Sequence, residues 1–121
     1  MLRRVNALPV DPVGDDGRTQ IVRVPGHLSH IAAAELDRTV KRIIALHNVS
    51  RIILDLTLVE VVTSIGVTSL LESRQTSQDH ATELILAGLP EQHRSFFTLL
   101  RVDQLFDFEN SVDEAVNRPF V

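Results

Sequence analysis

The sequence predicts an α/β fold: a mixed, mainly parallel sheet of about five strands, flanked by about four helices, with an antiparallel strand at its N-terminal edge. Strand-like and helix-like segments alternate along most of the chain, which is typical of parallel strands joined by helical crossovers. Two short apolar runs, at 52–54 and 84–86, have the composition of strands buried on both faces. A turn-rich segment near the N-terminus separates two further strands and predicts a hairpin.

The N-terminal part is expected to contain this hairpin and the first helix. Residues 3–10 form the first expected strand, and the Pro, Gly and Asp residues of 11–19 form its turn. The second strand alternates side chains over 19–24 and stops near Pro25 and Gly26. From Ile31 onward apolar residues recur three or four positions apart, which predicts a helix. Ser29 is the better of its two candidate N-caps by chemistry, the other being His30.

The rest of the chain continues the alternation. Residues 49–62 are rich in β-branched side chains and predict a strand, after which helical spacing resumes at Val67. The later elements are expected to be a strand in 84–90, a helix in 91–102 with Phe96 and Phe97 in the core, a strand in 105–109, and a last helix capped by Ser111.

Composition narrows the classes of function. The chain has 121 residues and a net charge of −4, which argues against general binding of nucleic acid, because that usually requires a basic face. The absence of cysteine excludes disulfides, thiolate catalysis and cysteine-ligated metals. No apolar run approaches the ~20 residues of a membrane span, and no export signal is recognisable. We therefore expect a soluble, cytoplasmic protein without cofactor or metal.

The joint between strand and helix at Thr63 and Ser64 is the first candidate site. Ser64 precedes the expected helix, and its hydroxyl can accept a hydrogen bond from an N–H group of the first turn. A helix N-terminus also stabilises anions, so a phosphoryl group on Ser64 would be accommodated there. The phosphate would add a charge of about −1.5 to −2 beside any docking surface. Ser64 is therefore interpreted as a cap or as a regulatory phosphoacceptor, with Thr63 as the alternative acceptor.

Two catalytic alternatives fit the sequence poorly. A nucleophile elbow has the pattern G-x-S-x-G, and Ser64 and Gly66 match only its second half, since Val62 occupies the first glycine position. His27 and His30 have a spacing that could hold a metal on a helix, but they fall in an expected loop without a carboxylate cluster. We expect no catalytic residue and no metal ligand.

The carboxyl ends of the parallel strands are the expected place for a binding site. Three expected loops meet at that edge, at 26–30, 63–66 and 88–90, and the opposite edge offers no comparable cluster. The sequence predicts a partner-binding surface composed of Gly26, His27, Leu28, Ser29, Thr63, Ser64, Ile65, Gly66, Val67, Gly88, Leu89 and Pro90.

Several segments together resemble the STAS domain family of anti-sigma factor antagonists. "IILDLTLVEVVTSIGVTSLL" resembles the family's central motif, in which a strand ends in "DLS" and a "DSSG" turn opens a helix. "VRVPGHLS", "LILAGLP" and "LLRVDQLFDFENSVDEAV" are similar to its preceding strand, next strand and closing segment, in the family's order. The resemblance covers about residues 18–117 and implies a single STAS-like domain over 1–121.

The resemblance also implies a function. Members of this family bind an anti-sigma factor with serine kinase activity and thereby free a sigma factor; the kinase phosphorylates a serine of the turn, and a phosphatase reverses the modification. Carried over, that serine is Ser64, and the motif's glycine is Gly66. The family's Asp falls on Thr63, and its second serine falls on Ile65.

Two alternatives from other classes stay open at this point. The first is a STAS scaffold or transporter accessory subunit that binds partners without being phosphorylated. The second is a small hydrolase that uses Ser64. The sequence names neither the sigma factor nor the oligomeric state.

Overall fold

The computed structural model describes residues 8–14, 16–46 and 48–120, and its centre is a five-stranded sheet in the order β1-β2-β4-β6-β7. β1 and β2 are antiparallel, and every other neighbouring pair of this sheet is parallel, which confirms the predicted fold class. In chain order the elements are β1 (Val10–Val13), β2 (Thr19–Arg23), β3 (His27–Leu28), α1 (His30–Leu46), β4 (Arg51–Asp55), β5 (Val61–Val62), α2 (Ser64–Asp79), β6 (Glu83–Ala87), α3 (Glu91–Leu99), the 3-10 turn η1 (Asp103–Leu105), β7 (Asp107–Glu109) and α4 (Val112–Asn117).

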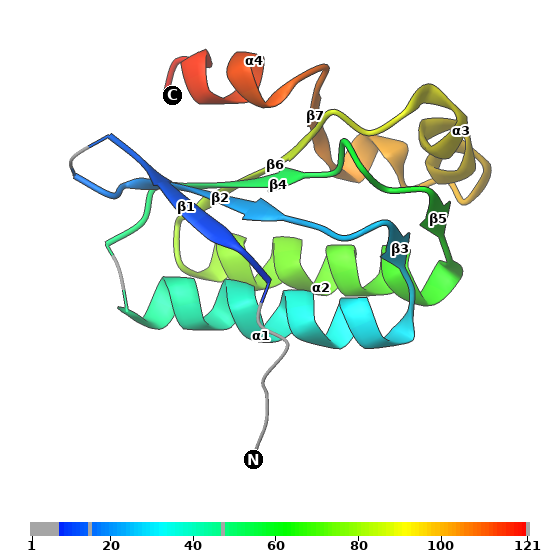
Figure 1. Ribbon diagram of the computed structural model, residues 1–121, viewed down its shortest axis with the longest axis horizontal. Coiled ribbons are helices and arrows are strands. Elements are labelled where there is room, and N and C mark those ends of the chain that lie inside the picture. The colour runs from blue at the N-terminus through cyan, green and yellow to red at the C-terminus, as the bar shows by residue number, and fades with distance from the viewer. Residues whose placement is uncertain (1–7, 15, 47, 121) are drawn as a thin grey trace.

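Helices cover both faces of the sheet (Figure 1). α1 and α2 lie side by side under one face, and the short α4 lies on the other. The two central strands are buried on both faces, as their uninterrupted apolar runs predict. The larger core cluster includes Val22, Leu36, Val40, Ile52, Leu54, Val67, Leu70, Leu86 and Phe97, and the smaller one, toward α4, contains Ile53, Ile85, Ala87 and Ala115.

Two aromatic residues of α3 pack in the larger core cluster, where the sequence predicts them. The Phe97 side chain is fully buried, and Phe96 is half-buried against the same cluster, which confirms the prediction for α3. The Phe97 ring meets Phe106 and Phe108 edge to face, with centroids 5.5 and 5.6 Å apart. These contacts attach η1 and β7 to α3.

The N-terminal hairpin is displaced from its predicted position. The expected first strand covers 3–10, of which 3–7 lie outside the described residues, and the structure has its strand at Val10–Val13, inside the expected turn. Val10 pairs with Val22, and the turn begins at Gly14, which adopts a positive φ of 73°. The prediction assigned Pro12 to the turn. It lies in β1 because an edge strand tolerates a proline that a central strand cannot.

The predicted strand over 49–62 is two strands separated by a loop. β4 ends at Asp55, whose carboxylate accepts hydrogen bonds from the Thr57 backbone N–H (3.0 Å) and hydroxyl (2.5 Å). This local turn takes the chain out of the main sheet. The following β5 then pairs in parallel with β3 in a separate two-stranded ribbon.

Small side chains set how closely α1 and α2 approach each other. Ser69, Ser73 and Ser77 recur every four residues along α2 and are buried. The Ser69 hydroxyl donates to the Ala33 carbonyl oxygen of α1 at 2.9 Å. The two helices therefore run together, and their N-termini lie at the same end of the molecule, beside β3 and β5 (Figure 1).

None of the helices in the described ranges is both long enough and apolar enough to cross a membrane.

Candidate functional site

The parallel register places three loops at one edge of the sheet, as predicted. Arg23 of β2, Asp55 of β4 and Ala87 of β6 are aligned, so these strands end at the same level. The chain then continues from β2 into β3, from β4 into β5 and from β6 toward α3. The β3–β5 ribbon extends beyond this edge, and its hydrogen bonds link the first two loops directly: Glu60 N–H donates to the Gly26 carbonyl oxygen at 2.6 Å.

The cap of α2 is Thr63 and not Ser64, which corrects the sequence-based assignment. Thr63 has extended backbone angles (φ −108°, ψ 165°), and its Oγ1 accepts from the Gly66 N–H at 3.1 Å. The same hydroxyl donates to the Leu28 carbonyl oxygen at 3.2 Å. Ser64 is consequently the first helical residue, and its side chain is exposed. Both hydrogen-bonding functions of the Thr63 hydroxyl are used within the fold.

Removing the Thr63 hydroxyl should destabilise the start of α2. We expect Thr63→Ala to lower the free energy of unfolding by about 0.5–2 kcal/mol, the usual cost of losing a helix cap, and Thr63→Ser to retain most of it. Urea denaturation of the three proteins measures this difference. Equal stability of wild type and Thr63→Ala would contradict the capping role.

Gly66 lies where α2 touches the ribbon. A Cβ on this residue would be 2.3 Å from the Leu28 carbonyl oxygen and 2.8 Å from the Leu28 Cγ. The glycine therefore allows the first turn of α2 to pack directly on β3, and this packing positions Ser64 and Ile65 at the surface. The physical reason for a glycine here is space, because its φ lies outside the left-handed region.

A side chain at position 66 should lower the free energy of unfolding more than loss of the Thr63 cap does. We expect Gly66→Ala to lower the free energy of unfolding by roughly 1–3 kcal/mol, because α2 or β3 must shift to relieve the overlap. Gly26→Ala is the matched control, since its Cβ would meet only the flexible Glu60 side chain at 3.2 Å and a carbonyl oxygen at 3.5 Å. If Gly26→Ala lost as much stability as Gly66→Ala, the overlap of a Cβ with Leu28 would not explain the glycine at position 66.

The predicted partner-binding residues differ in how they meet solvent. His27, Ser64 and Ile65 are exposed; Gly26, Ser29, Thr63, Gly88 and Pro90 are half-buried; Leu28, Gly66, Val67 and Leu89 are buried. The four buried residues serve as packing within this chain. The third loop packs on the first part of the β4–β5 connection, where a Cβ on Gly88 would lie 2.6 Å from Thr57 Oγ1.

Four apolar side chains at this end are exposed, and of these only Ile65 belongs to the predicted partner-binding surface. Leu58 is 74% exposed, Ile31 70%, Ile65 57% and Val61 40%. The sequence places Leu58 and Val61 in an expected strand and Ile31 at the start of an expected helix, where apolar side chains are usually buried. The signal that could have identified Leu58 is the Asp55-Leu56-Thr57 turn, which removes the following residues from the sheet.

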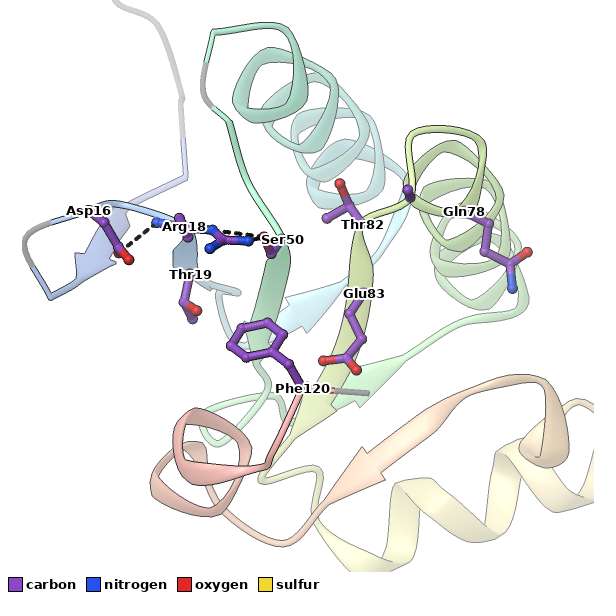
Figure 2. A pocket seen from close by; sticks show the side chains of 9 residues that line it. Asp16, Arg18, Thr19, Ser50, Gln78, Thr82, Glu83 and Phe120 are labelled. Atoms are coloured by element: carbon purple, nitrogen blue, oxygen red, sulfur yellow. Dashed lines mark hydrogen bonds between the residues drawn. The ribbon is translucent and has the colours of Figure 1, made fainter.

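The opposite edge of the sheet is not empty, which corrects the expectation that it lacks a comparable cluster. A hollow of about 750 Å³ opens there, at the amino ends of the parallel strands. Figure 2 shows its lining, in which Arg18 extends to Ser50 and donates to its hydroxyl at 2.8 and 3.1 Å. The other lining residues are Asp16, Thr19, Gln78, Ala81, Thr82, Glu83 and Phe120.

Arg51, beside this hollow, is a buried cation that sequence reasoning missed. Its Nε lies 2.5 Å from Glu83 Oε1, and its Nη1 donates to the Ala115 and Arg118 carbonyl oxygens at 3.0 and 2.6 Å. The Phe120 ring stacks on the guanidinium at 4.0 Å. Arg51 thus satisfies the carbonyl groups at the C-terminus of α4 and holds this helix on the sheet.

Neither catalytic alternative gains support from the geometry. Ser64 is absent from the described non-glycine residues with positive φ, which are Ala81 and Arg101, so the strained backbone of a nucleophile elbow is not present at this serine. His80 caps the other end of α2, roughly 24 Å of helix away from Ser64. Within the described part of the chain, no group of three or more His, Asp or Glu side chains is arranged to hold a metal.

Comparison with known proteins identifies the family. The STAS domain family model matches residues 13–115, and the chain therefore belongs to the STAS domain family. The matched residues include the mixed sheet from β2 to β7 and the turn into α2 described above.

Solved structures with the same fold include several anti-sigma factor antagonists. The antagonist SpoIIAA in its unphosphorylated form is similar with a TM-score of 0.70 and 21% identity, over 93% of this chain and 96% of that one. SpoIIAA of Bacillus has also been solved in a phosphorylated form, with a TM-score of 0.68, 21% identity and coverages of 93% and 98%. A sulfate transporter family protein from Wolinella succinogenes is similar with a TM-score of 0.63 and 16% identity, over 80% of each chain.

Proposed function

We propose that this chain is an anti-sigma factor antagonist: in its unmodified form it binds an anti-sigma factor with serine kinase activity, and phosphorylation of Ser64 releases it. A phosphatase would restore the binding form. The observation that carries the proposal is the position of Ser64, an exposed hydroxyl on the first residue of α2 in a STAS fold. The chain acts by protein binding, and its partner supplies the kinase chemistry.

The hydrogen bonds of the turn favour Ser64 over Thr63 as the acceptor. Phosphorylation of Thr63 would replace its hydroxyl hydrogen, which removes the bond to the Leu28 carbonyl oxygen and places a dianion against that oxygen. The Ser64 side chain can be modified while Thr63 keeps its bonds to the Leu28 carbonyl oxygen and the Gly66 N–H. Thr63 takes the position of the family's Asp and keeps the capping function, since both side chains offer an oxygen to the first turn.

The phosphate should change binding and leave the fold intact. At the N-terminus of α2 a negative charge is stabilised by about 0.3–1 kcal/mol, because the first N–H groups and the helix dipole face it. In a close interface, however, the dianion must be desolvated or matched by a cation. The switch therefore requires no rearrangement within this chain.

Phosphorylation with a candidate kinase tests the proposal. Histidine-kinase-like anti-sigma factors encoded in the source genome are purified and incubated with this chain and ATP, and the phosphosite is mapped by mass spectrometry. We expect phosphate on Ser64 in wild type and none in Ser64→Ala, whereas Thr63→Ser, the control for the turn, should still be modified at position 64. Failure of every such kinase, each shown to be active on another substrate, would contradict the proposal.

One feature of the turn favours a second candidate function. The family's Asp and second serine are replaced by Thr63 and Ile65, which removes a carboxylate that a kinase could recognise. A STAS module that binds its partner without being phosphorylated, such as a scaffold or transporter accessory subunit, accommodates both replacements. Tight binding of a partner by both wild type and Ser64→Ala, without phosphate on Ser64, would select this function.

A further inference from the structure

The surface around Ser64 is apolar to an unusual degree for an exposed turn. Ile31, Leu58, Val61 and Ile65, here called the apolar rim, are 70%, 74%, 40% and 57% exposed. Exposed apolar groups that gather at one place mark interaction sites more often than single exposed residues do. The rim supplies four such side chains from four different elements or loops.

Backbone contacts hold the rim together. Val61 N–H donates to the Gly26 carbonyl oxygen at 3.0 Å, and the Leu58 carbonyl oxygen lies 3.5 Å from the position of a Cβ on Gly26. Ile65 and Ile31 are each the second residue of a helix, α2 and α1, and both helices start beside the β3–β5 ribbon (Figure 1). The four side chains therefore surround one end of the molecule.

The rim continues into a groove at the start of α1. This groove has a volume of about 430 Å³, and Ile31 forms part of its wall. The remaining lining residues are Leu8, Pro25, Gly26, His27, Ser29, Ala32 and Glu35. Most of this lining is apolar, so the groove suits an apolar side chain of a partner.

Acidic side chains predominate at this end, and the nearby cation Arg23, at the end of β2, pairs with Asp11 at 2.8 Å. The two segments that build it, 24–37 and 52–73, contain no lysine or arginine and carry the carboxylates Glu35, Asp37, Asp55, Glu60 and Glu72. Glu35 and Asp37 pair with cations further along α1. Glu60 is exposed, lies beside Gly26, and is absent from the ion pairs formed among the described residues.

We propose that the apolar rim, its groove and Glu60 form one docking surface, and that its occupant is the face of a protein partner that presents an apolar side chain flanked by arginine or lysine. This inference rests on the proposed function, with the anti-sigma factor as the partner. It assigns Leu58 and Ile65 as specificity-determining residues, since Ile65 replaces a serine of the family motif with a side chain that only an apolar recess accepts. It also places the Ser64 phosphate inside the rim, where segments 24–37 and 52–73 offer no cation to neutralise it.

The test uses the full chain and the purified histidine-kinase-like anti-sigma factors of the source genome, without ATP. Each is titrated against wild type by calorimetry, and the one that binds is titrated against Leu58→Ser, Ile65→Ser and Glu60→Lys. The matched controls are Leu99→Ser, at the far end of α3 and 76% exposed, and Glu114→Lys, exposed on α4. We expect each rim or Glu60 variant to bind at least about tenfold more weakly and the controls to stay within about twofold. Raising the salt concentration should weaken wild type more than Glu60→Lys.

The outcomes separate this inference from the proposed function. A partner that binds wild type and the rim variants equally well would overturn the docking surface and leave the proposed function intact. Unchanged or tighter binding of Glu60→Lys would overturn the charge assignment. A wild-type dimer in sedimentation velocity that Leu58→Ser dissociates would show that the rim is covered by a second copy of this chain. Absence of binding by every anti-sigma factor would overturn the proposed function and with it this partner.

Discussion

Replacing Ser64 with glutamate should weaken binding of the anti-sigma factor by at least about 100-fold, while the thermal midpoint of unfolding changes little. A carboxylate at position 64 would face the apolar side chain of the partner, whose cation is matched to Glu60, and would lose its water without a new counter-ion. Leaving a charge unpaired in an interface costs several kcal/mol. Each 1.4 kcal/mol corresponds to about a factor of ten in affinity. The midpoint is preserved because an anion on the first residue of α2 is stabilised by the helix N-terminus.

Two variants control for this effect. Ser64→Ala should bind as well as wild type and resist the kinase, since it removes the acceptor oxygen without adding charge. Ser95→Glu, which introduces the same charge at an exposed serine of α3, should leave affinity within about twofold if only the rim matters. Calorimetric titration of the three variants against one anti-sigma factor gives the comparison. Wild-type affinity for Ser64→Glu would refute a charge-based switch.

Replacing Arg51 with methionine should cause the largest loss of stability of the changes considered. The variant retains an apolar chain of similar length but leaves the partly buried Glu83 without its cation and the carbonyl groups at the end of α4 without donors. Removing one partner of a buried ion pair typically costs about 3–5 kcal/mol. For a domain of this size we expect the thermal midpoint to fall by roughly 10–20 °C.

Arg118→Met is the matched control for this variant. Arg118 lies in the same region, but its guanidinium contacts Asp107 and Glu109 at 3.4 and 3.5 Å and is partly exposed. Such an ion pair contributes at most about 1 kcal/mol. Hydrogen exchange should further show that Arg51→Met loses protection first in α4, because this helix is held by the missing guanidinium. A midpoint for Arg51→Met that matches that of Arg118→Met would mean that packing alone holds α4.

The central elements could be predicted because their signals are local. The runs at 52–54 and 84–86 are uninterrupted and apolar, and short runs of this kind are typical of strands covered on both faces. Ser111 was identifiable as the cap of α4, and it does accept from the Glu114 N–H at 3.1 Å. Alternation of these segments with helical periodicity then leaves few topologies, since crossovers between parallel strands have one hand.

Local sequence could not decide which of two adjacent hydroxyls caps α2. Both Thr63 and Ser64 are good capping residues, and their order in the chain favours neither. The choice depends on the Leu28 carbonyl oxygen, 35 residues away, which accepts from Thr63 and fixes it as the residue outside the helix. The packing of Gly66 on the same carbonyl completes the turn and leaves Ser64 in solvent.

Tertiary contacts also explain why one charged residue is buried and one apolar residue is exposed, against the usual pattern. A charged residue at the start of a strand, such as Arg51, is usually solvated. Arg51 is nevertheless fully buried, because carbonyl groups at the C-terminal end of α4, more than 60 residues later, surround it. The sequence places Leu58 in an expected strand. Leu58 is nevertheless exposed, because the turn at Asp55 takes the chain out of the sheet. Sequence patterns alone predicted the family, the mixed and mainly parallel sheet, and the candidate serine. Only the three-dimensional contacts determined which side chains at this serine remain free to meet a partner, because burial is a property of neighbours that are distant in the chain.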